Sequence, residues 1–200
     1  NISILDFGSG SGVNINMLSK YGHVNIYEPH LITRKYLRIK FKKKKYSIIN
    51  KYTKKKFDLI LLADVLEHIK DDKKIVRELS KRLKNNGFIL ITVPSYKILF
   101  SKKDLILGHY RRYSKKEILN LFKKFKIIKL TFFNFILFFP IAFIIIFFKF
   151  LNIDFIDEVE KSPKKMINFT LFKIFNIERK LINYCNLPFG ISMLGLFQKK

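Results

Sequence analysis

Short apolar runs alternate with amphipathic segments along most of the chain. The runs are rich in Ile, Leu, Val and Phe, and they predict buried strands at 2–7, 23–27, 46–50, 57–63, 88–94, 125–133 and 188–200. The segments between them predict helices at 13–20, 31–42, 65–84 and 115–125. Regular alternation of strand and helix predicts an α/β fold, in which helices cover both faces of a mostly parallel sheet.

Three glycines follow the first predicted strand in LDFGSGSG, residues 5–12. Glycine at alternate positions allows sharp bends and lets a ligand approach the bare backbone. In an open α/β sheet this loop lies at the carboxyl ends of the strands, where ligands bind. A dinucleotide loop has the spacing G-x-G-x-x-G, which would require a small residue at position 13, but Val13 stands there.

Two acidic residues end the first two strands. Asp6 precedes the glycines, and its carboxylate would repel a pyrophosphate but attract a ligand that carries an ammonium and a sulfonium. Glu28 ends the second strand, where it can bind the hydroxyls of a ribose. Glu28 suits NAD and S-adenosylmethionine equally and does not distinguish them. Asp6 and the glycine spacing favour S-adenosylmethionine.

Four segments carry a resemblance to a known family. ILDFGSGSG, IYEP, FDLILLADVLEHIKDD and LKNNGFILITVP occur in the order of the motifs of class I S-adenosylmethionine-dependent methyltransferases. The resemblance covers residues 2–134 and returns at 188–200, and GHYRRYSKKEIL is similar to a segment of the branch with ubiquinone-type and bacterial glycan-locus enzymes. It implies a Rossmann-like, doubly wound sheet of seven strands with an antiparallel last strand.

The same resemblance implies a set of cofactor-binding residues. They are Asp6, Gly8, Gly10 and Gly12 for the methionine end of S-adenosylmethionine, Glu28 for its ribose, and Asp64 for the cofactor or substrate side. The family often places an acidic or polar residue after the third strand to meet the adenine amine. Asn50 is the candidate here.

Methyl transfer from a sulfonium needs no metal, because the leaving group is already activated. For a hydroxyl acceptor the protein supplies positioning and a general base. His109 in GHYRRYS is the candidate catalytic base, and His68 is either a second substrate-side residue or a structural histidine. Arg111 and Arg112 either clamp an acidic group of the acceptor or form a solvated basic turn.

The chain has a formal net charge of +25, from 40 Lys and Arg against 15 Asp and Glu. Two explanations of this charge remain open. An AT-rich genome encodes Lys often at surface positions that tolerate it, or the charge serves to bind an anionic partner such as RNA or a membrane. No D/N-P-P-[YFW] tetrad follows the fourth strand, where LADVLEH stands instead, which disfavours amino-group methylation of bases by that mechanism. We expect a nucleic-acid partner less than a membrane surface. The one cysteine, Cys185, excludes an internal disulfide and fits a reducing, cytoplasmic compartment.

Residues 132–148, FFNFILFFPIAFIIIFF, are almost wholly apolar. Seventeen helical residues reach about 25 Å, less than the ~30 Å hydrocarbon core of a bilayer, and Pro140 interrupts them. The later amphipathic stretch 166–184 contains charges that are costly inside a membrane. Because the last strand must return to the sheet, we expect a helical insertion that dips into one leaflet. The alternatives are a dry lid over the sheet and a homodimer interface.

These patterns divide the chain into a cofactor-binding core at 1–134, a hydrophobic insertion at 135–187 and a final strand at 188–200. The chain begins at Asn1, and we expect it to be a fragment without its N-terminal cap. The predicted function is O-methylation of a small-molecule, lipid-linked, isoprenoid or glycan acceptor, by a peripheral or monotopic protein at the inner face of the membrane. An RNA methyltransferase and a non-catalytic binding module remain as alternatives.

Overall fold

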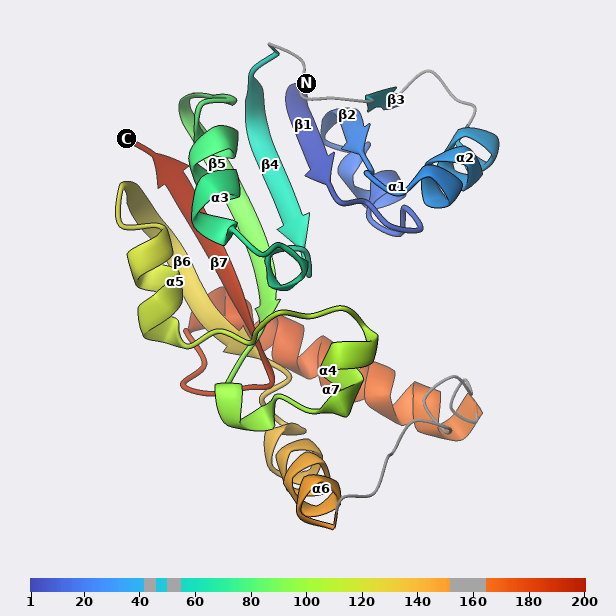
Figure 1. Ribbon diagram of the computed structural model, residues 1–200, viewed down its shortest axis with the longest axis vertical. Coiled ribbons are helices and arrows are strands. Elements are labelled where there is room, and N and C mark those ends of the chain that lie inside the picture. Colours follow the sequence, from blue (N-terminus) through green and yellow to red (C-terminus); the bar gives the residue numbers. More distant parts are fainter. Residues whose placement is uncertain (42–45, 50–54, 152–164) are drawn as a thin grey trace.

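The computed structural model describes residues 1–41, 46–49, 55–151 and 165–200, which build one sheet between two layers of helices (Figure 1). The strands are β1 (Ile2–Phe7), β2 (Gly22–Tyr27), β3 (Tyr46–Ile49), β4 (Phe57–Ala63), β5 (Leu83–Pro94), β6 (Phe125–Phe133) and β7 (Ser192–Lys199). The α-helices are α1 (Ile15–Leu18), α2 (Leu31–Lys40), α3 (Asp72–Ser80), α4 (Lys102–Ile106), α5 (Lys115–Leu121), α6 (Phe138–Phe150) and α7 (Lys165–Tyr184). Two short 3-10 helices are η1 (Leu66–His68) and η2 (Lys97–Leu99).

The seven strands follow the order β3-β2-β1-β4-β5-β7-β6. The neighbours from β3 to β5 pair in parallel, whereas β7 lies antiparallel between β5 and β6. The predicted fold class, including the antiparallel last strand, is therefore confirmed. Because β1 to β6 all run the same way, their carboxyl ends meet at one edge of the sheet (Figure 1).

The central strands are buried on both faces, which explains their continuous apolar runs. Ile4 and Leu61 belong to the cluster under α1 and α2, whereas Leu5, Ile60 and Leu62 belong to the larger cluster under α3 and α5. Adjacent residues of one strand therefore pack against helices on opposite faces of the sheet, as the alternation of side chains along a strand requires.

Several predicted boundaries were wrong. The single helix expected at 65–84 is divided into η1 and α3, because the Asp71 carboxylate accepts a hydrogen bond from the backbone N–H of Lys74 (2.9 Å) and starts a new helix there. The strand expected at 88–94 begins earlier, at Leu83, and residues 85–87 form an irregularity inside β5, where the register with β4 shifts and Asn86 has φ +60°. The helix predicted at 13–20 has four residues, and the last strand begins at Ser192 instead of 188.

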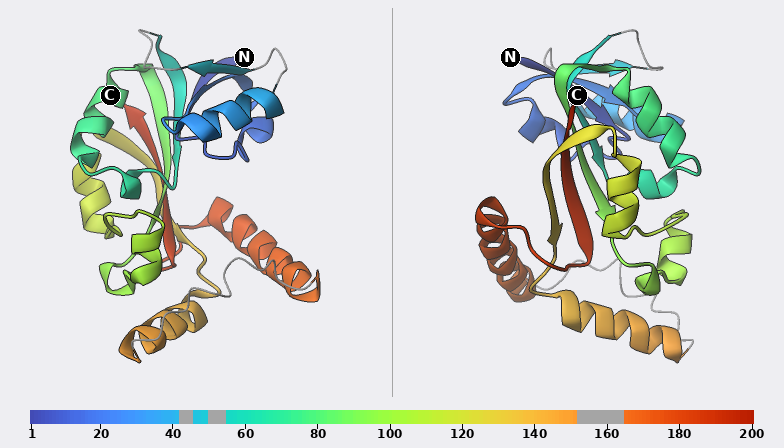
Figure 2. Two further views of the ribbon diagram at one scale, coloured as in Figure 1. Left: turned by 45° about the vertical axis from the view of Figure 1, so that its right-hand side comes forward. Right: turned by 90° about the vertical axis from the view of Figure 1, so that its left-hand side faces the viewer.

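The predicted helical insertion consists of α6 and α7, which come between β6 and β7 in the sequence. In space both helices lie beyond the carboxyl edge of the sheet (Figure 2). Pro140 lies in the first turn of α6, where its missing N–H needs no partner, so it does not interrupt the helix. The thirteen residues of α6 reach about 20 Å. Within the described ranges, none of the helices combines the length and the apolar character needed to cross a bilayer.

Candidate active site

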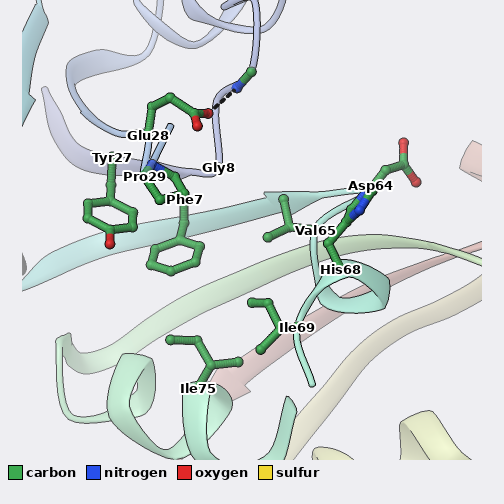
Figure 3. Close-up of a pocket in the computed structure, with 11 residues that line it drawn as sticks. Phe7, Gly8, Tyr27, Glu28, Pro29, Asp64, Val65, His68, Ile69 and Ile75 are labelled. Atoms are coloured by element: carbon green, nitrogen blue, oxygen red, sulfur yellow. Dashed lines mark hydrogen bonds between the residues drawn. The ribbon is translucent and has the colours of Figure 1, made fainter. Parts of the chain in front are cut away.

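A pocket of about 510 Å³ opens at the carboxyl ends of β1, β2 and β4 (Figure 3). Gly8, Gly10, Glu28 and Asp64, which the sequence predicted for the cofactor, all line it. The remaining lining residues are Phe7, Tyr27, Pro29, Val65, His68, Ile69 and Ile75.

The glycine loop connects β1 to α1 and bends sharply, as the sequence predicted, through residues with a left-handed backbone. Gly8 and Gly12 have φ of +75° and +78°. A Cβ added at Gly8 would lie 2.8 Å from Val65, and one added at Gly12 would lie 2.8 Å from Leu37. A Cβ at Gly10 would meet nothing within 4 Å, so the backbone of Gly10 is open toward the pocket that it lines. Gly12 does not line the pocket and instead lets the loop pack closely on α2.

Glu28 ties this loop to the end of β2. Its Oε2 accepts a hydrogen bond from the backbone N–H of Gly10, and its Oε1 accepts one from the backbone N–H of His30, both at 2.9 Å. The carboxylate is buried although it lines the pocket. Each carboxylate oxygen can accept more than one hydrogen bond. Glu28 can therefore hold the loop and still receive the hydroxyls of a ribose.

Asp6 lies at the carboxyl end of β1, next to the pocket-lining Phe7 but not itself in the lining. It is 2% exposed, and its Oδ2 has no hydrogen-bond partner among the residues that the structure describes. Burial raises the pKa of this carboxyl to about 6. A buried carboxylate with a vacant oxygen, under a glycine loop with an open backbone, suits the ammonium of S-adenosylmethionine, so the residues present fit this cofactor.

The apolar side of the pocket was missed by the sequence analysis. Phe7 and Tyr27 stack with their ring centroids 4.8 Å apart. Figure 3 shows Val65, Ile69 and Ile75 directed toward the same space. Such a surface suits the flat face of a nucleoside base. The alternation of β1 and β2 made Phe7 and Tyr27 look like ordinary core positions, and no signal in the sequence distinguished them.

Asp64 follows β4 in a left-handed conformation, with φ +52°. Its Oδ1 accepts a hydrogen bond from the Thr92 hydroxyl (3.0 Å), and in Figure 3 its carboxylate points away from the centre of the pocket. A left-handed backbone at a non-glycine residue is uncommon and is typical of functional turns. Asn50, the predicted adenine contact, lies outside the described residues.

The predicted base His109 is held by a buried carboxylate that the sequence analysis did not identify. Asp104 on α4 is 1% exposed, and its Oδ1 lies 2.9 Å from Nδ1 of His109 and 2.9 Å from Nε of Arg112. Burial alone would raise the pKa of Asp104, but the hydrogen bonds of Arg112 and His109 outweigh it and hold the pKa below its usual value. This arrangement directs the second ring nitrogen of His109, Nε2, away from Asp104.

The two predicted arginines make internal ion pairs. Arg112 pairs with Asp104, whereas Arg111 pairs with Asp72 (3.2 Å) and donates a hydrogen bond to the carbonyl of Lys70 (2.6 Å). Both guanidinium groups therefore fasten the loop 108–114 to α3 and α4. They do not form the solvated basic turn considered from the sequence, and the acceptor clamp stays a prediction.

Three side chains from η1 and the loop 108–114 meet beside the pocket. The rings of His68 and His109 pack edge to face at 4.6 Å, and ligand atoms of Glu67, His68 and His109 all lie within 4.8 Å of one another. This cluster is one place where the described residues could hold a metal ion, although the predicted reaction needs none. Burial raises the pKa of Glu67 to about 8, while burial and the neighbouring His109 lower the pKa of His68.

Comparisons with known proteins agree with this geometry. Residues 1–128 match the model of a family described as a methyltransferase domain. Among curated proteins, a ubiquinone biosynthesis O-methyltransferase of Pelagibacter ubique is 29% identical, and the match spans 54% of this chain and 50% of that protein. The chain therefore spans about half the length of this relative.

Solved structures share the fold. An S-adenosylmethionine-dependent methyltransferase of Mesorhizobium loti has a TM-score of 0.64 at 13% identity, covering 100% of this chain and 91% of that one. The N-methyltransferase NodS of Bradyrhizobium japonicum, in complex with S-adenosyl-L-homocysteine, has a TM-score of 0.58 at 12% identity, covering 99% and 78%. At these identities the likeness concerns the fold alone.

Proposed function

Since its first 128 residues match the methyltransferase-domain family, the chain belongs to the S-adenosylmethionine-dependent methyltransferases, and we propose that it methylates an oxygen of a lipid-linked, isoprenoid or glycan acceptor at a membrane surface. The observation that carries the proposal is the pocket under the glycine loop, beside the buried Asp6 carboxylate whose Oδ2 has no described partner. Asp6, Gly8 and Gly10 would hold the methionine end of the cofactor, and Glu28 its ribose.

The cofactor supplies a methyl group already activated on a sulfonium, so the chain has to position the acceptor and take one proton. His68 lines the pocket, whereas His109 does not. The lowered pKa of His68 keeps its imidazole neutral at pH 7, so it can accept a proton. We therefore assign the base function to the His68–His109 pair, in which Asp104 orients His109 through Nδ1.

When bound, S-adenosylmethionine would supply the methyl group from its sulfonium and would leave as the neutral thioether. His68 would take the hydroxyl proton of the acceptor, which balances the transfer. The stacked Phe7 and Tyr27 would hold the base of the cofactor, and the apolar Val65 lines the pocket between them and His68 (Figure 3).

Turnover and cofactor affinity, measured side by side, distinguish acid–base catalysis from cofactor binding. His68→Ala and His109→Ala should each lower turnover about 100-fold or more while the affinity for S-adenosylmethionine changes little. His23→Ala is the matched control, because His23 pairs with Ser47 at the amino end of β2. Equal losses of turnover and affinity would place the histidine in the cofactor contact and not in acid–base catalysis.

The acceptor class is tested in cells that carry or lack the gene and are fed methionine with a labelled methyl group. Gene-dependent label in the lipid or glycan fraction is the expected result. Gene-dependent label in RNA would replace the proposal with the nucleic-acid alternative. Cofactor binding by the purified chain with no gene-dependent label in any fraction would favour a non-catalytic binding module.

A further inference from the structure

Large apolar side chains lie in solvent at the carboxyl edge of the sheet. They gather on three neighbouring segments, α6, α7 and residues 98–107, which together we call the apolar face. In Figures 1 and 2 these segments lie beyond the carboxyl ends of β4, β5 and β6. The Lys149 ammonium joins two of them, because it donates to the carbonyls of Ile98 (3.4 Å) and Phe100 (3.3 Å).

The helix α6 exposes most of its apolar surface. Phe143 is 68% exposed and Phe150 is 82% exposed, and the exposed side also carries Phe139 and Phe147. In residues 98–107, Ile98 and Leu105 to Leu107 are exposed as well and extend this surface. Soluble proteins rarely leave so large an apolar patch uncovered, which indicates that something covers it.

The helix α7 projects from the body of the protein (Figure 2). Residues 165–170 are exposed on all sides of the helix, including Met166 and Phe169. The other half of α7 is fixed by Glu178, which is 3% exposed. Its carboxylate accepts hydrogen bonds from the backbone N–H groups of Asn134, Phe135 and Ile136, at the turn that leads into α6. Glu178 therefore holds α7 against the start of α6.

The charges of the described part of this face are basic. Lys165, Lys173 and Lys180 are exposed on α7, and Lys102 and Lys103 are exposed on α4. The Lys173 ammonium lies 4.4 Å from the ring centroid of Phe169, so charge and apolar surface are adjacent. Lysine can bury its aliphatic stem in an apolar layer and keep its ammonium at the boundary with water. The acidic stretch 154–160 lies outside the described residues.

We propose that the apolar face docks on an anionic lipid bilayer and enters one leaflet. Apolar side chains flanked by lysines match the acyl boundary and the anionic headgroups of such a surface. A second copy of this chain would bring the same lysines to the contact and be repelled. The two helices point in different directions (Figure 2), so a protein partner would need separate grooves, whereas lipid adapts to both.

This docking would place the pocket close to its acceptor. The pocket and the apolar face share the carboxyl edge of the sheet, so the docked protein presents that edge to the bilayer. A lipid-linked acceptor could then reach the pocket while its tail stays in the leaflet. This consequence rests on the proposed function, but the docking itself does not.

Flotation with vesicles tests the docking. The chain should float with phosphatidylcholine vesicles that contain phosphatidylglycerol, and part of it should stay bound at high salt. Phe143→Asp and Phe172→Asp should each weaken this binding about tenfold or more. Each removes a ring that would lie in the leaflet and adds a negative charge, which the anionic headgroups repel. The matched control is Ile39→Asp, since Ile39 is 71% exposed, similar to Phe143, and belongs to α2, which lies far from the apolar face in Figure 1.

A charge variant separates the electrostatic contribution to membrane binding from the apolar one. Lys173→Glu combined with Lys180→Glu should weaken binding to the anionic vesicles at least about tenfold and leave binding to pure phosphatidylcholine vesicles unchanged. Calorimetry with S-adenosylmethionine accompanies each variant, because unchanged cofactor binding shows an intact fold. A chain that binds the cofactor but does not float would overturn the docking and the membrane surface named in the proposed function, but it would leave the proposed methyl transfer itself standing.

Two further results would also overturn it. Equal flotation of Phe143→Asp and the parent chain would show that the apolar face is not the contact. A dimer in lipid-free solution that Phe143→Asp converts to a monomer would show that a second copy covers the face instead. Flotation of a chain that fails to bind S-adenosylmethionine would support the docking and count against the proposed function.

Discussion

Two buried carboxyl groups lie next to residues that line the pocket, and each has an oxygen without a described partner. Asp6 at the end of β1 adjoins the part proposed for the cofactor, which we call the cofactor side, and Glu67 in η1 adjoins His68 in the part proposed for the acceptor, which we call the acceptor side. Burial raises both pKa values, that of Asp6 to about 6 and that of Glu67 to about 8. At pH 7 Asp6 is therefore mostly charged, whereas Glu67 mostly keeps its proton.

The difference shows what each side is prepared to bind. A charged carboxylate held away from water is stabilised by a cation, and the ammonium of the cofactor would supply one. A protonated carboxyl group beside His68 and His109 can instead donate a hydrogen bond or exchange a proton. The charges of Asp64 and Asp104 help to keep the proton on Glu67, although burial is the main cause.

The largest expected effect is on the cofactor side. Asp6→Asn keeps the shape of the side chain but removes its charge, so the affinity for S-adenosylmethionine should fall by roughly 10- to 100-fold, or about 1.5–3 kcal/mol. The same change should raise the free energy of unfolding at pH 7.5 by up to about 3 kcal/mol, because a costly buried charge disappears. Calorimetry measures the first quantity and urea unfolding the second. An unchanged affinity would mean that Asp6 does not meet the ammonium.

Glu67→Gln tests whether Glu67 is protonated, through the pH dependence of the free energy of unfolding. Between pH 6 and pH 8 folded Glu67 keeps a proton that the unfolded chain has released, so the free energy of unfolding falls as pH rises. The contribution of Glu67 over this window is about 2 kcal/mol. The glutamine side chain of the variant has no proton to lose, so the variant should lack this part of the decline. Urea unfolding at pH 6, 7 and 8 compares the two proteins, and parallel curves would show that Glu67 is charged at neutral pH.

Cofactor affinity itself should depend on pH. In the proposed contact Asp6 must be a carboxylate and the cofactor amine must keep its proton. The affinity of the parent chain should therefore be highest between the Asp6 pKa of about 6 and the usual α-amino pKa of about 8. Below the Asp6 pKa the affinity should fall, by up to about tenfold for each pH unit. Asp6→Asn should show no such dependence. A parent chain and a variant that lose affinity in parallel would assign the titration to another group.

The smallest effect is expected at Glu28. Glu28→Gln keeps an oxygen for one of the two backbone N–H groups, of Gly10 and His30, but removes the charge, so cofactor affinity should fall by about 0.5–1.5 kcal/mol. NAD should not bind the parent chain or the variant. Hydrogen exchange at the Gly10 amide should become faster in the variant, which would show that Glu28 also fixes the glycine loop. Slow exchange retained at Gly10 would exclude that second role.

The cofactor side could be predicted because its features are local in sequence. Gly8 and Gly12 need a left-handed backbone, and this need is visible in the residue type alone. Asp6 is the second-last residue of β1 and Glu28 directly follows β2, so both lie at the carboxyl ends of neighbouring strands. The roles assigned to them remain predictions, but their positions follow directly from the alternation of strand and helix.

The acceptor side could not be predicted because it is assembled from distant segments. Glu67 and His68 come from η1, whereas Asp104 and His109 come from α4 and the loop after it. The sequence suggested a continuous helix over 65–84, which would have directed Glu67 and His68 differently. Arg111 and Arg112 looked available to a substrate, because nothing in the sequence showed that Asp72 and Asp104 would reach them.

Local sequence patterns were enough to predict the sheet, the glycine loop and the apolar character of residues 132–148, because strand periodicity, glycine conformation and hydrophobicity are properties of neighbouring residues. Which polar groups meet and which apolar groups stay uncovered depends on the packing of distant segments. Glu178 ties α7 to the turn before α6 across more than forty residues, and Asp104 gathers His109 and Arg112. Such pairings depend on how the chain returns to its own surface, and hydrophobic periodicity does not encode that path.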